Sequence, residues 1–154
     1  VQDELGHVND YVTIQRIRFD NRFHLDLDIS SEYLDNKVLK LILQPLVENA
    51  LYHGLNYCTT GDTITIRAYT ENNCLMIDVH DNGQGMAIET LTKLQSSLME
   101  EASFTELGHR NKQSIGLKNI HSRIELYYGK GYGLTVTSIH GEWTNIQIRL
   151  PILK

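Results

Sequence analysis

The sequence predicts an α/β protein, a two-layer sandwich in which a mixed, mostly antiparallel sheet is covered on one face by helices. Two observations predict this class: strand patterns lie on both sides of helical patterns along the chain, and the chain closes with a predicted hairpin. With 154 residues, there is room for one domain with a substantial core and little else.

The chain opens with a helical pattern. Apolar residues recur at helical intervals over residues 2–18, with charged residues between them, which predicts a helix. Since the chain has no start methionine and begins in helical register, we expect residues 1–18 to be the end of a preceding helical linker and residues 19–154 to form the domain itself. Alternation over residues 23–29 then predicts a strand with one buried face.

A second helix is predicted after a turn. Its apolar stripe runs over residues 36–52, and Gly54 is well placed to end it. Pro45 falls inside this predicted helix. Because its ring carries no N–H, we expect it to kink the helix and to free the carbonyl of Leu41.

The middle of the chain predicts an antiparallel strand pair and a helix. Residues 63–69 and 74–79 are rich in β-branched and apolar side chains, and residues 71–73 make a plausible tight connection between them. Asp81 follows the second strand. A further helix is predicted over residues 87–99.

The last third predicts a loop, a helix and a closing hairpin. Residues 100–113 are polar, contain one glycine and lack sustained periodicity, so we interpret them as a mobile lid. A helix is predicted over residues 116–128. Glycines at 129, 131 and 133 predict a turn, and residues 134–139 and 145–150 predict the hairpin that completes the sheet.

Composition argues against several classes of partner. Fourteen basic residues against 19 acidic ones give a net charge of -5, and no basic tract indicates nucleic-acid binding. No apolar run approaches the roughly 20 residues that span a bilayer, so we expect no membrane contact by this segment. Cys58 and Cys74 are too few for a disulfide framework, which favours reduced thiols in a cytosolic setting.

Polar residues repeat at helical spacing within the apolar segment from residue 44 to residue 54. Asn49 and His53 share one face of the predicted helix, and Gln44 and Glu48 share another. A polar row beside an apolar stripe is usually a solvated face. Taken alone, this pattern does not distinguish such a face from a binding site.

Two glycine motifs change that interpretation. One is Asp-Asn-Gly-Gln-Gly-Met at residues 81–86, and the other is Ser-Ile-Gly-Leu-Lys-Asn-Ile at residues 114–120. With the Gln-Pro-Leu-Val-Glu-Asn-Ala-x-x-His-Gly segment that starts at Gln44, they resemble the G1, G2 and N boxes of the GHKL ATPase superfamily. Within it the chain is similar to the catalytic ATP-binding domain of sensor histidine kinases. The resemblance covers essentially the whole chain and implies ATP and Mg²⁺ as cofactors.

The first glycine motif has the chemistry to bind adenine. The exocyclic amine of adenine donates a hydrogen bond, which the Asp81 carboxylate can accept and which a guanine carbonyl cannot supply. Gly83 and Gly85 let the backbone approach a purine closely and adopt positive φ. The resemblance adds Met86 to this site. The alternative is that Asp-Asn-Gly makes only a turn after a strand.

The second glycine motif has the chemistry to bind phosphate. If Gly116 and Leu117 open a helix, their free amides and the positive end of the helix dipole would meet a triphosphate. Ordinary loop-to-helix geometry is the alternative. The P-loop pattern is absent from the sequence.

The remaining site residues are assigned by resemblance. Asn49 is expected to ligate Mg²⁺ through its amide oxygen, which suits the preference of this ion for oxygen ligands. Glu48 is expected to act with Asn49 in catalysis, as a general base or by positioning water. His53 is expected to contact phosphate, although a structural histidine is an equal alternative, and Thr144 is expected to approach the nucleotide.

The resemblance implies a protein-histidine kinase that donates the ATP γ-phosphoryl to a histidine on an upstream dimerisation domain. We expect the phosphoacceptor to lie outside this chain, because His7 lacks the His-Phe-x-x-Asn pattern. The implied parent is a homodimer, anchored in a membrane with this domain in the cytoplasm, that serves a response regulator.

Two other functions remain open at this point. The first is an ATP-driven conformational module of the chaperone, gyrase or mismatch-repair type. Pro45 argues against it, because hydrolysing relatives carry a glutamate at that position. The second is a scaffold domain that binds no nucleotide, in which all three motifs would be coincidental.

Overall fold

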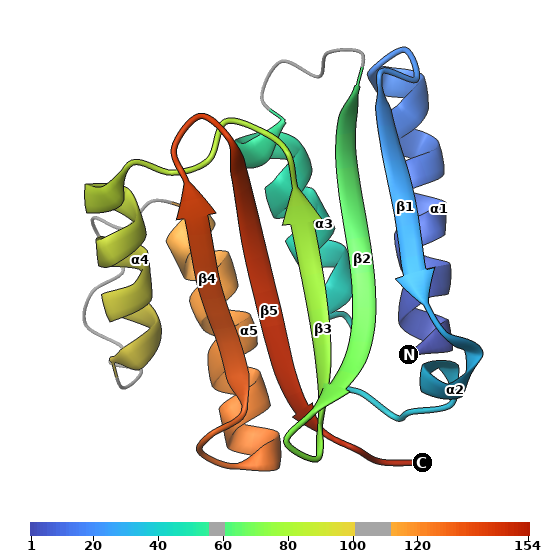
Figure 1. Cartoon of the computed structure of the whole chain (residues 1–154), viewed down its shortest axis with the longest axis vertical. Coiled ribbons are helices and arrows are strands. Elements are labelled where there is room, and N and C mark those ends of the chain that lie inside the picture. Colours follow the sequence, from blue (N-terminus) through green and yellow to red (C-terminus); the bar gives the residue numbers. More distant parts are fainter. Residues whose placement is uncertain (56–60, 101–111) are drawn as a thin grey trace.

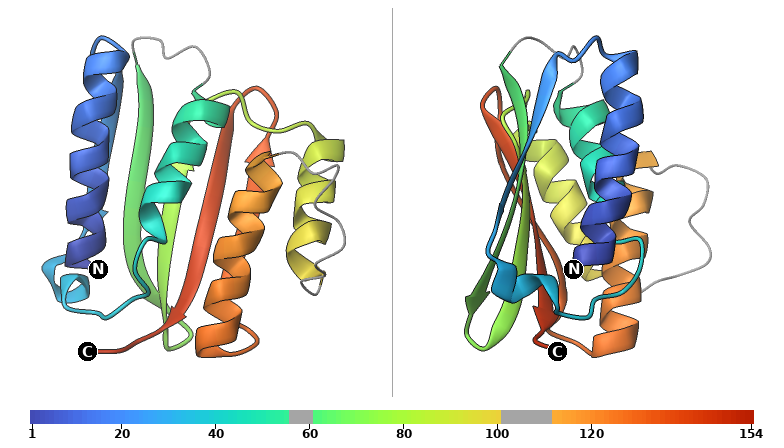
Figure 2. Two further views of the ribbon diagram at one scale, coloured as in Figure 1. Left: turned by 180° about the vertical axis from the view of Figure 1, so that it is seen from behind. Right: turned by 90° about the vertical axis from the view of Figure 1, so that its right-hand side faces the viewer.

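The computed structural model describes residues 1–55, 61–100 and 112–154. It forms two layers, a five-stranded sheet and a layer of helices on one of its faces (Figure 1; Figure 2, right). The strand order is β1-β2-β3-β5-β4. The strands are β1 (Phe23–Ile29), β2 (Asp62–Glu71), β3 (Cys74–Asp81), β4 (Gly133–Ile139) and β5 (Trp143–Pro151).

The predicted fold class is confirmed. β1 pairs with β2 in parallel, whereas the β2–β3, β3–β5 and β4–β5 pairs are antiparallel, so the sheet is mixed and mostly antiparallel. The helices are α1 (Gln2–Arg18), α2 (Ser31–Leu34), α3 (Leu43–Asn49), the π-helix η1 (Ala50–Gly54), α4 (Ile88–Met99) and α5 (Lys112–Tyr128). In the described part of the chain, no helix is long and apolar enough to cross a membrane.

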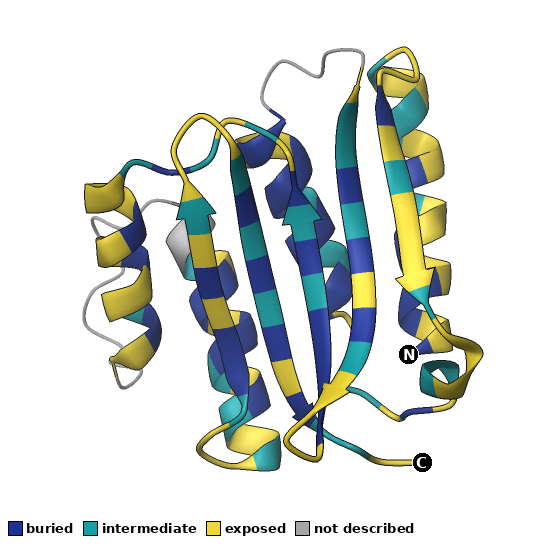
Figure 3. Cartoon of the chain, in the orientation of Figure 1, coloured by how far each residue is buried: buried dark blue, intermediate teal, exposed yellow. Residues whose placement is uncertain are grey.

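The core lies between the sheet and the helices. Along β2 and β5 buried apolar residues alternate with more exposed ones, which gives the striped pattern of these strands in Figure 3. Only the face toward the helices needs to be apolar, because the other face meets solvent. Fully buried members of this core include Leu43, Leu46, Leu51, Ile64, Ile66, Leu75, Ile77 and Ile124.

The buried face predicted for the first strand is only partly present. Phe23 is buried, but Leu25 is half-buried and Leu27 is 43% exposed. β1 is an edge strand of the sheet. Alternation in the sequence predicted the strand correctly but did not predict how exposed Leu25 and Leu27 are.

The second predicted helix begins later than expected. The pattern predicted residues 36–52, but α3 starts at Leu43 and continues into η1. Pro45 is therefore the third residue of α3, where a backbone N–H has no partner within the helix, and the predicted mid-helix kink is wrong. The carbonyl of Leu41, which precedes α3, accepts a hydrogen bond from Nη1 of Arg123 at 3.3 Å.

The two predicted hairpin connections are confirmed. Asn72 and Asn73 both adopt left-handed backbone conformations (φ 48° and 59°) between the paired residues Glu71 and Cys74. This geometry gives the twist that a two-residue hairpin loop needs. The β4–β5 hairpin closes around Gly141, whose φ is 81°.

The last helix begins earlier than predicted. α5 starts at Lys112, so Gly116 and Leu117 lie within it rather than at its first turn. The N–H of Gly116 consequently belongs to the helical ladder, and the prediction that it opens the helix is wrong. The predicted lid, residues 100–113, lies outside the described residues apart from its ends.

Candidate functional site

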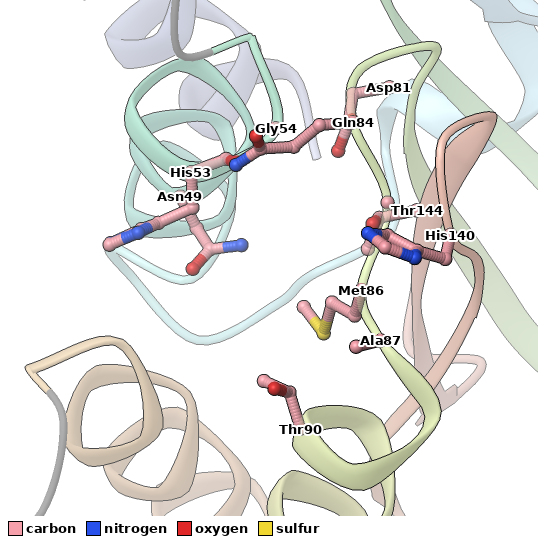
Figure 4. A pocket seen from close by; sticks show the side chains of 11 residues that line it. Asn49, His53, Gly54, Asp81, Gln84, Met86, Ala87, Thr90, His140 and Thr144 are labelled. Carbon is pink, nitrogen blue, oxygen red and sulfur yellow. The ribbon is translucent and has the colours of Figure 1, made fainter.

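A cavity of about 270 Å³ opens between the C-terminal end of the α3–η1 segment, the end of β3 and the β4–β5 hairpin (Figure 4). Residues from four separate parts of the chain contribute to its wall. They are Asn49, His53, Gly54, Asp81, Gln84, Gly85, Met86, Ala87, Thr90, His140 and Thr144.

Asp81 is the buried acid of this cavity. It is the last residue of β3 and only 2% exposed, and its Oδ1 accepts a hydrogen bond from the N–H of Gly83 at 3.0 Å. Burial raises its pKa to about 6, the Gly83 hydrogen bond opposes this rise, and the charge of Asp62 adds to it. A desolvated carboxylate of this kind keeps acceptor capacity that a ligand amine can use.

Glycines surround Asp81 because β-carbons would displace it. A β-carbon at Gly54 would overlap the Asp81 carboxylate, and one at Gly83 would overlap the carbonyl of Gly54. Gly83 therefore serves close approach rather than the predicted positive φ, which it does not adopt. Gly85 has a φ of 64°, as predicted, and a β-carbon there would overlap the carbonyl of Ile139.

Thr144 lies beside Asp81, although 63 positions separate them in the sequence. The antiparallel pairing of β3 with β5 places the two residues directly opposite each other. The Thr144 hydroxyl is 3.0 Å from the Ser138 hydroxyl, which accepts the N–H of Met86 at 2.8 Å and donates to the carbonyl of Trp143. This network ties the loop that carries Met86 to the hairpin that carries Thr144.

Asn49 and His53 line the cavity on the side formed by the α3–η1 segment. Asn49 is the last residue of α3, and its side chain points into the cavity in Figure 4. The widened turn of η1 follows directly, a local feature often found at functional sites. His53 is exposed, its pKa is lowered by partial burial, and its carbonyl accepts a hydrogen bond from Nε2 of Gln84 at 2.7 Å.

A second cavity of about 260 Å³ adjoins the first, because Asn49 and His53 line both. Its other walls include Glu48, Gly116 and Leu117. Although Gly116 and Leu117 do not open α5, the fold still brings them against the α3–η1 segment. Glu48 is half-buried, and its Oε1 accepts a hydrogen bond from Nε2 of Gln44 at 3.0 Å, as their helical spacing predicted.

The structure thus gathers the predicted site residues into two adjoining cavities, except Gly83, which lines neither of them. Gln84, Ala87, Thr90 and His140 also line the first cavity and were not predicted. Gln84 lies within the Asp-x-Gly-x-Gly motif, so its sequence position was a usable signal. His140 belongs to a hairpin turn, and nothing in the local sequence marks it as part of a site.

The donor set fits an adenine nucleotide with a hard cation. In the described residues, no cluster of three or more histidine, cysteine or acidic side chains could hold a metal by protein ligands alone. The amide oxygen of Asn49 is available to a cation that takes its other ligands from water and phosphate, as Mg²⁺ commonly does.

Comparison with known families and relatives agrees with this geometry. The model of the family described as histidine kinase-, DNA gyrase B- and HSP90-like ATPase matches residues 34–154. The chain is 37% identical over 151 residues to the sensor histidine kinase YesM of Bacillus subtilis, and 32% identical over 152 residues to the sensor protein kinase HptS of Staphylococcus aureus. These alignments cover 98% and 99% of this chain but 23% and 28% of those proteins.

A solved structure shares the fold. The histidine kinase AdeS of Acinetobacter baumannii superposes with a TM-score of 0.58 over 98% of this chain and 66% of its own, at 14% sequence identity. The chain spans about a quarter of the length of the curated relatives named above.

Proposed function

The chain belongs to the family of histidine kinase-, DNA gyrase B- and HSP90-like ATPases, and from this premise we propose that it is the ATP-binding catalytic domain of a sensor histidine kinase. In this proposal it donates the γ-phosphoryl of ATP to a histidine on an upstream dimerisation domain. ATP binding is a property of the family's domain. The whole-chain similarity to sensor kinases supports the choice of a kinase within the family.

The observation that carries the proposal is the buried Asp81 carboxylate at the edge of the first cavity. Its Oδ1 already accepts one backbone hydrogen bond, and the remaining acceptor capacity faces a cavity of ligand size. The exocyclic amine of adenine donates to such a group. Guanine has a carbonyl at the corresponding position, so two acceptors would face each other.

The triphosphate would extend from the first cavity toward the second. Asn49, shared by both cavities, would hold Mg²⁺ at the boundary, and Gly116 and Leu117 would border the terminal phosphates. Mg²⁺, when bound, neutralises charge on the phosphate oxygens. In phosphoryl transfer the protein mainly positions reactants and stabilises charge, so few protein groups are needed.

Glu48 is suited to receive a proton from the incoming histidine. It lies in the second cavity beside Asn49, and the hydrogen bond from Gln44 restricts its carboxylate. As the unprotonated imidazole nitrogen attacks the γ-phosphorus, the bond from this phosphorus to the bridging oxygen breaks and ADP leaves, and the proton on the other ring nitrogen would pass to Glu48. Pro45 offers no second carboxylate one turn earlier, which favours a kinase over an ATP-hydrolysing module.

The proposal extends to the parent protein. Helix α1 lies outside the matched family region and would be the end of a helical linker from the domain that carries the acceptor histidine. The parent would be a membrane-anchored homodimer with this domain in the cytoplasm, and its phosphorylated histidine would serve a response regulator.

Titration calorimetry with ATP, ADP and GTP, each in Mg²⁺ and in a chelator, tests the proposal. We expect ATP and ADP to bind more tightly in Mg²⁺, and GTP to bind at least about tenfold more weakly than ATP, from the loss of one buried hydrogen bond. Equal affinity for GTP and ATP would refute the adenine assignment. Absence of binding by all three nucleotides would refute the function.

A further inference from the structure

The turn that precedes α3 is held by a side chain from a distant helix. Glu4 of α1 is 3% exposed, and its carboxylate accepts hydrogen bonds from the N–H groups of Leu41, Ile42 and Leu43 at 2.7, 2.9 and 3.1 Å. The residue at the N-cap position, Ile42, has no side-chain acceptor of its own. Glu4 therefore caps the start of α3, although 37 to 39 positions separate it from the residues whose N–H groups it accepts.

The carbonyl groups of the same turn are held by another helix. Arg123 of α5 donates from Nη2 to the carbonyl of Lys40 at 2.7 Å and from Nη1 to the carbonyl of Leu41 at 3.3 Å. Leu41 has a φ of 58°, a left-handed conformation that a branched side chain resists. A strained turn of this kind persists only where its surroundings hold it.

The turn is positioned to control one end of the nucleotide site. α3 is seven residues long, with the Glu4 contacts at its first turn and Asn49 at its last residue. A short hydrogen-bonded helix moves as a unit, so a shift at Leu43 is transmitted to Asn49. Asp81 and Thr144 lie on the strands β3 and β5 and not on this helix.

We propose that Glu4 is a positioning residue for the metal-binding end of the nucleotide site, acting through the start of α3, and that Arg123 supports it from the opposite side of the turn. The inference rests on the proposed function, because it takes Asn49 as the Mg²⁺ ligand. Glu4 precedes the matched family region, which starts at residue 34. A displacement of α1 against α3 would thus change Mg²⁺-dependent affinity more than adenine recognition.

The test uses the Glu4→Gln substitution, which keeps the size of the side chain. A carboxamide has one acceptor oxygen in place of two and turns an N–H₂ group toward backbone donors. The matched control is Asp3→Asn, an exposed carboxylate one position earlier on the same helix. Calorimetry measures ATP affinity of each variant in Mg²⁺ and in a chelator, and thermal unfolding reports the stability of each.

We expect Glu4→Gln to weaken ATP binding in Mg²⁺ by about tenfold while affinity in chelator changes less than about twofold, with Asp3→Asn unchanged in both. A purely structural role would lower both affinities together, and that result, or no change in either, would overturn the inference. If Glu4→Gln fails to fold, Arg123→Gln replaces it, because Arg123 is exposed. That variant must show the same Mg²⁺-specific loss, and unchanged Mg²⁺-dependent affinity would overturn the inference.

The two proposals fail in different ways. If the unsubstituted chain binds ATP equally with and without Mg²⁺, the assignment of Asn49 is wrong and this inference falls with it. If the ATP affinity of the unsubstituted chain depends on Mg²⁺ and that of Glu4→Gln depends on Mg²⁺ to the same degree, only the role of Glu4 is refuted.

Discussion

Replacing the buried acid of the site with its amide should stabilise the domain and weaken its nucleotide binding at the same time. The change is Asp81→Asn, which keeps the shape of the side chain and its hydrogen bond from the N–H of Gly83. It removes the negative charge that burial disfavours. Functional sites often carry such a stability cost, because a group arranged for a ligand is poorly solvated without it.

The magnitude follows from the pKa of Asp81, which rises from 3.8 in the unfolded chain to about 6 in the folded domain. Below pH 3.8 both states hold the proton and the ionisation makes no difference. As the pH rises, the unfolded chain loses the proton first, so the folded state loses stability until about pH 6. At about 1.4 kcal/mol per pH unit, the loss is about 1 kcal/mol at pH 4.5 and about 3 kcal/mol at pH 7.5.

Urea unfolding without nucleotide, at pH 4.5 and pH 7.5, measures both proteins. We expect the unfolding free energy of Asp81→Asn to exceed that of the unsubstituted chain, and this excess should be about 2 kcal/mol larger at pH 7.5 than at pH 4.5. Calorimetry at pH 7.5 should show ATP affinity lower by about 1–3 kcal/mol. A stability difference that does not change with pH would refute the argument from burial, and unchanged ATP affinity would refute the role of Asp81.

Three further outcomes are expected. Asn49→Ala should lower ATP affinity at least about tenfold in Mg²⁺ but little in chelator. Its circular dichroism spectrum should match that of the unsubstituted chain, and loss of the folded spectrum would show that Asn49 is structural. Gly54→Ala should reduce ATP affinity and cost about 1–3 kcal/mol in urea unfolding, because its β-carbon overlaps the Asp81 carboxylate. The control is Gly6→Ala, whose β-carbon meets open space within α1 and which should raise the unfolding free energy by about 0.5–1 kcal/mol. Equal losses of unfolding free energy in the two variants would disprove the steric explanation. With γ-labelled ATP the chain alone should form no acid-labile phosphohistidine, whereas added acceptor-histidine helices of the parent should become labelled through proximity. Label on the lone chain would place the acceptor within it.

Several features of the site were determined by the sequence alone. Helical spacing put Asn49 on one face with His53 and paired Gln44 with Glu48, and the structure has both relations. Such relations depend on neighbours within one turn, which local geometry fixes. The strand that ends in Asp81 was predictable for the same reason, because its run of apolar and β-branched residues and its tight turn are both local.

Other features were decided only by the tertiary structure. Thr144 lies opposite Asp81 because β5 pairs with β3, and strand order cannot be derived from local periodicity. Gly54 was assigned as a helix end, but its missing β-carbon makes space for a carboxylate 27 positions away.

The start of α3 illustrates the physical reason most directly. The apolar stripe continues upstream of Leu43, so periodicity alone extended the helix to residue 36. The chain instead turns at Leu41, because Glu4 and Arg123 satisfy the backbone groups that a longer helix would have paired internally. Local pattern sets which conformations a segment can adopt, and hydrogen bonds from distant residues select among them.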